Sequence, residues 1–291
     1  MVNWNPYLDS LCNAYTQGWQ VFTIMDGVRQ KREGSKPSSV LLDFTLMGQT
    51  VQPDSQRLGN GHKRVERLSI LEGLRKYASE HVLLVGCSGS GKSTALARLL
   101  LEEAQKGRGR WGEGEEQQPL APSLLRMTGE DLPKIPVLVE LRYYQTSVLS
   151  LIQDFFRRHG LWLQDAEINE LLFQGQFLLL LDGLNELPSE EALQDLKALR
   201  LDNPDTPMVF TTQDLGGEDD LDIDKKLEMQ PLTEEQMRQF SLAYLSEQEE
   251  EMLRQLGSRL QEFGQTPLLL KMLCSVFVDN SNKIPPNLGL M

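Results

Sequence analysis

The sequence predicts an α/β domain with a parallel sheet flanked by helices, followed by a partial all-α helical domain. Short, continuously apolar segments alternate with amphipathic helical segments between residues 81 and 212, which is typical of a parallel sheet covered on both faces. After an acidic stretch at 218–224, the pattern indicates helices only. The 291 residues fit one large domain or two modest ones, since about 150 residues per domain is usual.

The composition is that of a globular protein. Hydrophobic residues make up 40% and charged residues 24%, which excludes a disordered or fibrous chain. The 29 basic and 42 acidic residues give a net charge of −13, so we expect no direct binding to nucleic acid or to an anionic membrane surface. The three cysteines are far apart, which excludes a disulfide scaffold or zinc ribbon and favours a reducing compartment.

The sequence also predicts where the protein resides. The N-terminal residues MVNWNPYLDS lack the basic start of a secretory signal and reach Asp9 early. No apolar run approaches the roughly 20 residues that span a bilayer. We therefore expect a cytoplasmic protein with no membrane span.

The N-terminal segment, residues 1–62, is predicted to be partly helical. Apolar residues recur there at helical spacing, and Pro6 suits a first helical turn after Asn5. The segment also interleaves four aromatic residues, Trp4, Tyr7, Trp19 and Phe22. They fit a surface for a partner protein and a small core equally well.

Residues 63–230 are predicted to form the α/β domain. Amphipathic periodicity or cap signals indicate helices over 65–78, 92–105, 148–156, 165–174 and 189–200. Apolar segments indicate strands over 81–85, 135–141, 176–181 and 208–212. Residues 107–134 contain five Gly and three Pro and are predicted to form a surface insertion.

Residues 231–291 are predicted to form an incomplete helical domain. Thr233–Gln236 and Ser246–Glu249 are both capping boxes, in which a hydroxyl and a Glu or Gln side chain satisfy the first backbone groups of a helix. Gly264 suits the end of the second helix, and Thr266 with Pro267 suits the start of a third. The Met and aromatic side chains of these helices are expected in the core.

The strongest motif is Gly86-Cys87-Ser88-Gly89-Ser90-Gly91-Lys92-Ser93, which matches GxxxxGK[ST] in full. It follows an apolar strand and opens a helix with Lys92, Ser93 and Thr94. Glycines let backbone N–H groups converge on phosphate oxygens, and the helix N-terminus attracts negative charge. Lys92 would reach the β- and γ-phosphates, while Ser93 would bind Mg²⁺. The alternative is a glycine-rich turn that contains a lysine by chance.

A second motif supplies carboxylates. The apolar strand in QFLLLLDGLNEL (176–187) ends at Asp182, the position of a Walker B carboxylate that holds Mg²⁺. Glu186, four residues later, could orient or deprotonate an attacking water. A third segment, Val209–Gln213, ends a strand with polar residues. If it lies between the other two strands, it could face the γ-phosphate; a strand that simply runs into a loop fits equally well.

Together these segments resemble the NACHT family of P-loop ATPases in the STAND class of signalling switches, with bacterial, including cyanobacterial, members the most similar. The resemblance covers roughly residues 65–280. It rests on the order of six segments: VLLVGCSGSGKSTALARLL (82–100), IPVLVELR (135–142), LLLLDGLNELP (178–188), VFTTQ (209–213), MQPLTEEQM (229–237) and TPLLLKMLC (266–274).

The resemblance implies an ASCE-type P-loop fold, in which another strand separates the Walker A and Walker B strands. It also implies a switch that ADP holds closed and that ATP opens for homo-oligomerisation and binding to protein partners. Pro267 stands where the family contacts adenine. Gln213 stands where an arginine often senses the γ-phosphate, and Asn185 where a second acidic residue is common. Both differences remove charge, so they put the hydrolysis rate in doubt more than ATP or ADP binding. Cys87-Ser88 replaces the usual basic-Pro pair.

Three functions remain open from the sequence. The first is a nucleotide switch in signal transduction, of a defence type, with slow Mg²⁺-dependent ATP hydrolysis. The second is a working ATPase of the AAA+ type that remodels a partner, and the third is an interaction scaffold without nucleotide function. Family members continue into a winged-helix domain, and we expect this chain to stop before it.

Overall fold

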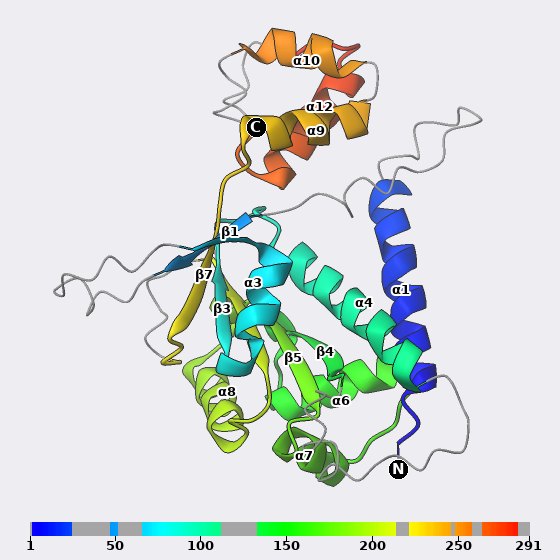
Figure 1. Cartoon of the computed structure of the whole chain (residues 1–291), viewed down its shortest axis with the longest axis vertical. Helices are drawn as coiled ribbons and strands as arrows, with labels where there is room; N and C mark the ends of the chain where they lie inside the picture. The colour runs from blue at the N-terminus through cyan, green and yellow to red at the C-terminus, as the bar shows by residue number, and fades with distance from the viewer. Residues whose placement is uncertain are drawn as a thin grey trace, which may run out of the picture. The chain divides into compact units, whose positions relative to one another are not determined.

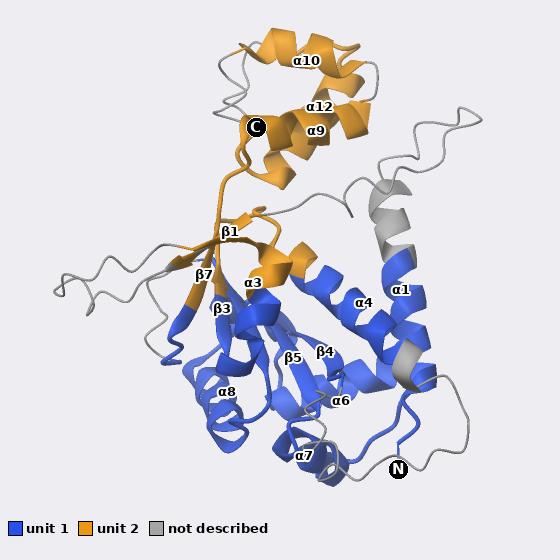
Figure 2. Ribbon diagram, in the orientation of Figure 1, with its two compact units in different colours: residues 1–16, 74–83, 96–225 blue, residues 17–73, 84–95, 226–291 orange. Residues whose placement is uncertain are grey.

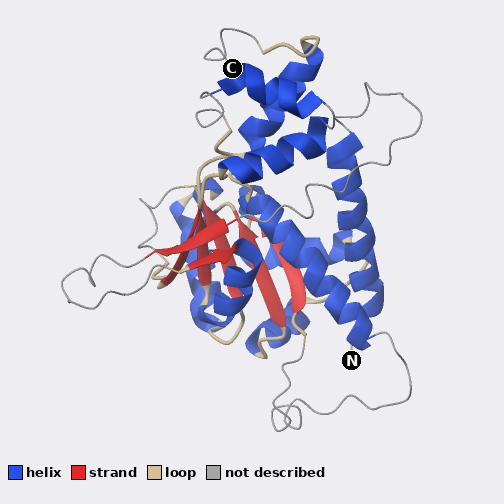
Figure 3. Ribbon diagram, turned by 45° about the horizontal axis from the view of Figure 1, so that its top comes forward, coloured by secondary structure: helices blue, strands red, loops and turns tan. Residues whose placement is uncertain are grey.

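The computed structural model describes residues 2–24, 47–51, 66–111, 133–213, 221–245, 248–257 and 264–284. It is a mixed α/β fold, with a sheet flanked by helices (Figures 1 and 3). The strands are β1 (Met47–Val51), β2 (Arg67–Ser69), β3 (Val82–Val85), β4 (Ile135–Glu140), β5 (Phe177–Asp182), β6 (Met208–Thr212) and β7 (Lys225–Met229). The longer helices are α1 (Asn5–Ile24), α3 (Ile70–Tyr77), α4 (Lys92–Trp111), α6 (Val148–Arg158), α7 (Asp165–Phe173), α8 (Glu190–Asp202), α9 (Glu234–Leu245), α10 (Glu249–Leu256) and α12 (Pro267–Asp279).

The seven strands lie in the order β2-β1-β7-β3-β6-β5-β4. Strand β5 pairs in parallel with β4 and with β6, whereas β1 pairs antiparallel with β2 and with β7. The strand before the glycine-rich segment, β3, and the strand that ends at Asp182, β5, are separated by β6. The segment Val209–Gln213 therefore includes most of the strand that lies between the other two, the position considered for it from the sequence.

The chain divides into two compact units (Figure 2). Unit 1 contains residues 1–16, 74–83 and 96–225, and unit 2 contains residues 17–73, 84–95 and 226–291. Unit 1 thus holds β4, β5 and β6 with α6, α7 and α8. Unit 2 holds the glycine-rich segment together with the C-terminal helices.

The start of α1 belongs to the core of unit 1. Trp4 and Tyr7 are 4% and 1% exposed, and the Tyr7 hydroxyl donates a hydrogen bond to the Pro136 carbonyl at 2.7 Å. Their rings pack against Phe155, Phe156 and Phe177. For these two aromatics the core interpretation is confirmed over the partner surface; the side chains of Trp19 and Phe22 lie outside the described residues.

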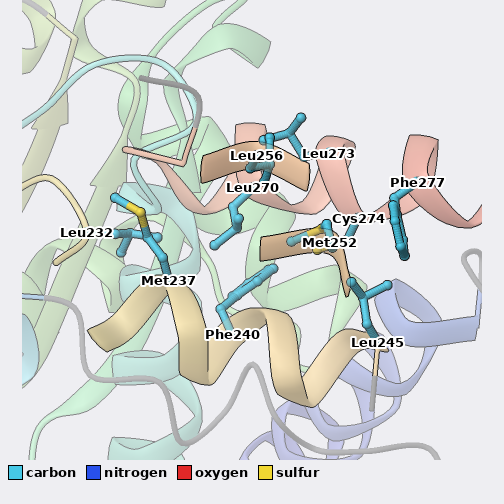
Figure 4. Close-up of a cluster of buried hydrophobic side chains, with 10 residues drawn as sticks. All are labelled: Leu232, Met237, Phe240, Leu245, Met252, Leu256, Leu270, Leu273, Cys274 and Phe277. Atoms are coloured by element: carbon cyan, nitrogen blue, oxygen red, sulfur yellow. The ribbon is translucent and has the colours of Figure 1, made fainter. Parts of the chain in front are cut away.

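The C-terminal helices have a small core of their own (Figure 4). Met237 and Phe240 of α9, Met252 of α10 and Phe277 of α12 are all buried in it. The Thr233–Gln236 capping box is present, since the Gln236 N–H donates to the Thr233 hydroxyl at 3.2 Å and the Thr233 N–H to the Gln236 side chain at 2.8 Å. The core role predicted for these Met and aromatic side chains is confirmed.

Several predicted boundaries are wrong. The helix predicted over 65–78 begins only at Ile70, because Ser69 and Glu72 form a capping box there and Arg67–Ser69 pair as β2. A strand, β7, follows the acidic stretch where only helices were predicted. Helix α10 ends at Leu256 with Gly257 at φ 52°, before the predicted cap at Gly264. Ser246 lies outside the described residues, as does most of the predicted insertion, although α4 extends into it as far as Trp111.

Candidate functional site

The glycine-rich segment, Gly86–Ser93, forms a tight loop between β3 and the first turn of α4. Gly89 and Gly91 have φ angles of 75° and 100°, in the left-handed region that glycine adopts without a steric penalty. The Ser90 N–H donates to the Cys87 carbonyl at 3.2 Å, and the Ala95 N–H to the Gly91 carbonyl at 2.8 Å. The sequence therefore folds this segment so that the loop leads directly into a helix N-terminus.

The Lys92 side chain folds back over the loop. Its Nζ donates to the Gly86 carbonyl at 2.5 Å and to the Cys87 carbonyl at 3.0 Å, and the residue is 9% exposed. A buried ammonium needs such partners because its desolvation is unfavourable. A cation is thus held within the loop by two backbone carbonyls.

The loop also contains a polar group that is not satisfied. The Ser90 hydroxyl oxygen is buried and has no hydrogen-bond partner among the described residues. Such a group costs about 1–3 kcal/mol when it stays unpaired. Ser93 and Thr94 are exposed in the first turn of α4, where backbone N–H groups lack helical partners. The loop therefore fits an anion with several oxygens.

Space around the loop is tight enough to require glycine. A Cβ atom on Gly86 would lie 2.7 Å from the Ser90 Oγ and 2.8 Å from the Met229 Cβ. A Cβ atom on Gly89 would lie 2.7 Å from the Leu268 Cβ. Neither Gly86 nor Gly89 has room for a side chain unless its neighbours move.

The first turn of α12 contacts this loop within unit 2. The Leu268 N–H donates to the Gly89 carbonyl at 3.3 Å. The helix start is fixed because the Thr266 hydroxyl accepts from the Leu269 N–H at 3.3 Å, with Pro267 in the first turn. As predicted from the sequence, Thr266 and Pro267 begin this helix. The start of the helix lies next to the loop Gly86–Ser93.

Unit 1 holds the candidate carboxylates. Asp182 ends β5, and its Oδ1 accepts a hydrogen bond from the Thr211 hydroxyl at 2.5 Å. The same hydroxyl accepts from the Gly183 N–H at 2.8 Å. Thr211 is fully buried in β6, so one side chain fixes both the carboxylate and the turn that follows it.

Asn185 and Gln213, the two uncharged residues discussed in the sequence analysis, lie together. The Asn185 side-chain oxygen accepts a hydrogen bond from the Gln213 N–H at 3.1 Å. The bond joins the short 3-10 helix Leu184–Glu186 to the end of β6, and both residues are exposed. An amide side chain here connects neighbouring loops without adding charge.

Glu186 is exposed beside charged groups that follow β4. Arg142 forms an ion pair with Glu140. Burial alone would lower the pKa of Arg142, but Glu140 and, more weakly, Glu186 raise it overall. Glu186 therefore lies within electrostatic reach of a cation as well as near Asp182 in sequence.

The structure thus arranges the predicted residues in two groups. Unit 2 contains the loop residues and Pro267, and unit 1 contains Asp182, Glu186, Asn185 and Gln213. Sequence reasoning missed Thr211 and Arg142. The signal for Thr211 was a hydroxyl in an otherwise apolar strand. Among the described residues, no cluster of three or more His, Cys, Asp or Glu side chains could hold a metal ion.

Comparisons with known proteins add little. No family model and no curated protein matches the sequence. One solved structure, described as an ATPase, is 14% identical over 69% of this chain and 77% of its own, with a TM-score of 0.27. In the part of the chain that the structure describes, no helix combines the length and apolar character needed to cross a bilayer.

Proposed function

We propose that this chain binds ATP and ADP with Mg²⁺ and acts as a nucleotide-dependent switch with slow hydrolysis. The observation that carries the proposal is the loop Gly86–Ser93. It combines left-handed glycines, a buried lysine ammonium and an unpaired serine hydroxyl at a helix N-terminus. This is the chemistry that recognises a polyphosphate.

Each candidate residue has a proposed role. The loop amides of Gly86 through Ser93, with Thr94, would bind phosphate oxygens, and Lys92 would place a point charge on the β- and γ-phosphates. Ser93 and Asp182 would hold Mg²⁺, which prefers oxygen ligands and keeps several waters. The ion would neutralise phosphate charge when bound. Glu186 would orient or deprotonate the attacking water.

Slow hydrolysis is proposed from the neutral pair Asn185 and Gln213. Gln213 has no positive charge to place on a γ-phosphate, unlike the arginine common at that position, and Asn185 adds no carboxylate near Asp182. The switch itself is proposed from the Leu268–Gly89 contact, because a change in the loop would act on the first turn of α12. We also propose that Pro267, in the first turn of α12, contacts the adenine of the nucleotide.

The family-level role is part of the proposal. We propose an ASCE-type, NACHT-like module in signal transduction, in which ATP favours homo-oligomers and binding to protein partners. The strand order around β6 supports the ASCE type. The cytoplasmic location likewise remains a prediction from the sequence.

The first test is to denature the purified chain and identify any released nucleotide, then to titrate fluorescent ADP with and without Mg²⁺. Near-stoichiometric ADP would support a closed switch. Lys92→Ala should weaken ADP binding about 10- to 100-fold, since it removes hydrogen bonds from a charged donor. Lys106→Ala is the matched control, because Lys106 lies on the same helix and pairs only locally with Glu103 among its described contacts.

The alternatives give different results. Rapid multiple-turnover hydrolysis would favour the working ATPase, in which case Glu186→Gln should abolish turnover while ADP still binds. Absence of both bound nucleotide and ADP titration would favour the scaffold. Equal hydrolysis by the wild type and Glu186→Gln would contradict the role of Glu186.

A further inference from the structure

Unit 1 contains a surface hollow that none of the candidate nucleotide residues line. Its volume is about 400 Å³, and α6, α7 and α8 all contribute to its wall. Helix α6 packs against both α7 and α8 (Figure 1), so the wall belongs to the folded core of the unit. The apolar part of the lining includes Leu149, Phe173 and Leu199.

The hollow is acidic. Two of its eight lining residues, Asp195 and Asp202, are carboxylates, and none is cationic. Helix α7 carries three acidic and no basic residues, and α8 carries four acidic and two basic residues. The lining therefore favours a cationic ligand group, as do α7 and α8, whereas α6 carries one acidic and two basic residues.

The carboxylates of Asp195 and Asp202 differ in their hydrogen bonding. The Asp195 Oδ2 accepts a hydrogen bond from the Val148 N–H at 2.6 Å and so caps the first turn of α6. Asp202 is exposed in the last turn of α8 and has neither a hydrogen bond nor an ion pair with any described residue. An anion at a helix C-terminus opposes the helix dipole, an unfavourable position that a bound cation would relieve.

Large apolar side chains surround the hollow. Phe173 is 73% exposed, and Leu201 is 70% exposed. Leu201 lies three residues after the lining residue Ala198, so both are on neighbouring positions of α8. A small molecule inside the hollow would leave these side chains in water, whereas a protein partner would cover them.

We propose that this surface, formed by Leu149, Phe173, Leu199, Leu201 and Asp202 and called here the α7–α8 surface, docks an amphipathic helix with basic residues from a partner protein. An arginine or lysine of that helix would place its methylene stem along the leucines and its cationic head beside Asp202. The Phe173 ring would add a cation–π contact. Apolar residues of the partner helix would cover Leu201. At this acidic surface, a second copy of this chain with its net charge of −13 is a less favourable occupant than a basic helix.

The test uses a fluorescein-labelled helical peptide of about 18 residues, a length that gives about five turns, with leucine on one face and arginine beside it. A second peptide has glutamate in place of each arginine. Fluorescence anisotropy with the full chain should show binding of the arginine peptide only. Asp202→Asn and Phe173→Ser should each weaken that binding about five- to tenfold.

Two matched controls remove the same chemistry elsewhere. Asp224→Asn removes an exposed carboxylate and Leu242→Ser an exposed apolar side chain, and neither should change peptide binding. Both pairs of variants change exposed residues, so thermal melting should stay near the wild type. ADP affinity should also be unchanged, which separates this test from that of the proposed function.

Three outcomes would overturn the proposal. The first is equal binding of the arginine and glutamate peptides, and the second is failure of the arginine peptide to bind. The third is a self-association of the chain that Phe173→Ser abolishes, since the occupant would then be a second copy. Sedimentation velocity at several concentrations distinguishes this last case.

Discussion

At the scale of single residues, a buried hydroxyl determines how the candidate Mg²⁺ ligand is held. Thr211 donates to Asp182 and accepts from the Gly183 N–H, and it comes from a strand 29 residues away in sequence from Asp182. Gly183 follows the last residue of β5 and adopts a φ angle of 85°, and its N–H donates to the Thr211 hydroxyl. The carboxylate and the turn therefore depend on one oxygen atom.

Replacing Thr211 with valine should destabilise the chain by about 1–3 kcal/mol, because the nearly equal volume is kept while the buried Gly183 N–H loses its acceptor. Urea unfolding followed by circular dichroism measures this change. Thr211→Ser keeps the hydroxyl and is the matched control, which should lose less. If the valine variant is as stable as the serine variant, the hydroxyl does not hold this turn.

The same scale shows what sequence could predict of the site. The loop residues Gly86–Ser93 could be proposed for phosphate binding because that role depends on local backbone geometry, which glycine spacing indicates. The role of Thr211 could not, since its partner Asp182 is on another strand, and neither could the effect of Glu186 on Arg142, since Glu186 follows a different strand. The hydrogen bond between Asn185 and Gln213 likewise became evident only when β5 and β6 were seen as neighbours.

At the scale of elements, the predicted alternation of strands and helices is confirmed from β3 to β6, because continuous apolar runs and helical periods were both strong there. Strand β7 was missed because its sequence KKLEM is mostly charged. Only Leu227 and Met229 alternate toward the core, so it is a half-buried strand next to an acidic stretch. Its antiparallel partner β1 was missed as well, because its five residues include Gly and Gln and do not form a continuous apolar segment.

The contact between the loop Gly86–Ser93 and the first turn of α12 leads to a prediction about the stability of glycine variants. Gly89→Ala should destabilise the chain more than Gly160→Ala. Both glycines have nearly the same φ, 75° and 76°, so each alanine bears about 1–2 kcal/mol of backbone strain. Only at Gly89 does the new Cβ meet another residue, Leu268, at 2.7 Å. Urea midpoints of the two variants measure the difference.

Gly160 is a matched control because nothing lies within 4 Å of its added Cβ atom. ADP affinity should fall in Gly89→Ala and stay unchanged in Gly160→Ala if the loop binds phosphate. Equal loss of stability in the two variants would show that α12 does not press on the loop.

At the scale of the whole molecule, the start of the N-terminal helix, up to residue 16, belongs to unit 1. Sequence periodicity gave the helix but not its place, because the contacts that hold it join residues more than a hundred positions apart. Tyr7 bonds to Pro136, and the Ser10 hydroxyl lies 3.0 Å from the His159 Nδ1. Long-range packing of this kind leaves no local signature.

The packing around His159 makes stability depend on pH. Burial, aided by Arg158, lowers the pKa of His159 to about 4 from an ordinary value near 6.5. Burial and Arg200 also lower the pKa of His81. In the folded state both rings therefore stay neutral at a pH where the unfolded chain takes up protons. The contribution of His159 to stability is complete above about pH 6.5 and is lost as the pH falls toward 4, and the lowered pKa of His81 acts in the same direction.

His159→Gln should therefore reduce the loss of stability between pH 7.5 and pH 5, because glutamine cannot take up that proton. The amide can still donate toward Ser10, although it loses the ring contacts with Phe155 and Tyr7, so the variant should be less stable at pH 7.5. Urea unfolding of both proteins at each pH gives the comparison. The difference in unfolding free energy between wild type and variant should shrink as the pH falls, since only the wild type pays for keeping this ring neutral. A difference that stays constant across this range would mean that His159 titrates normally in the folded chain, and that the packing of α1 against α6 leaves its ring open to water.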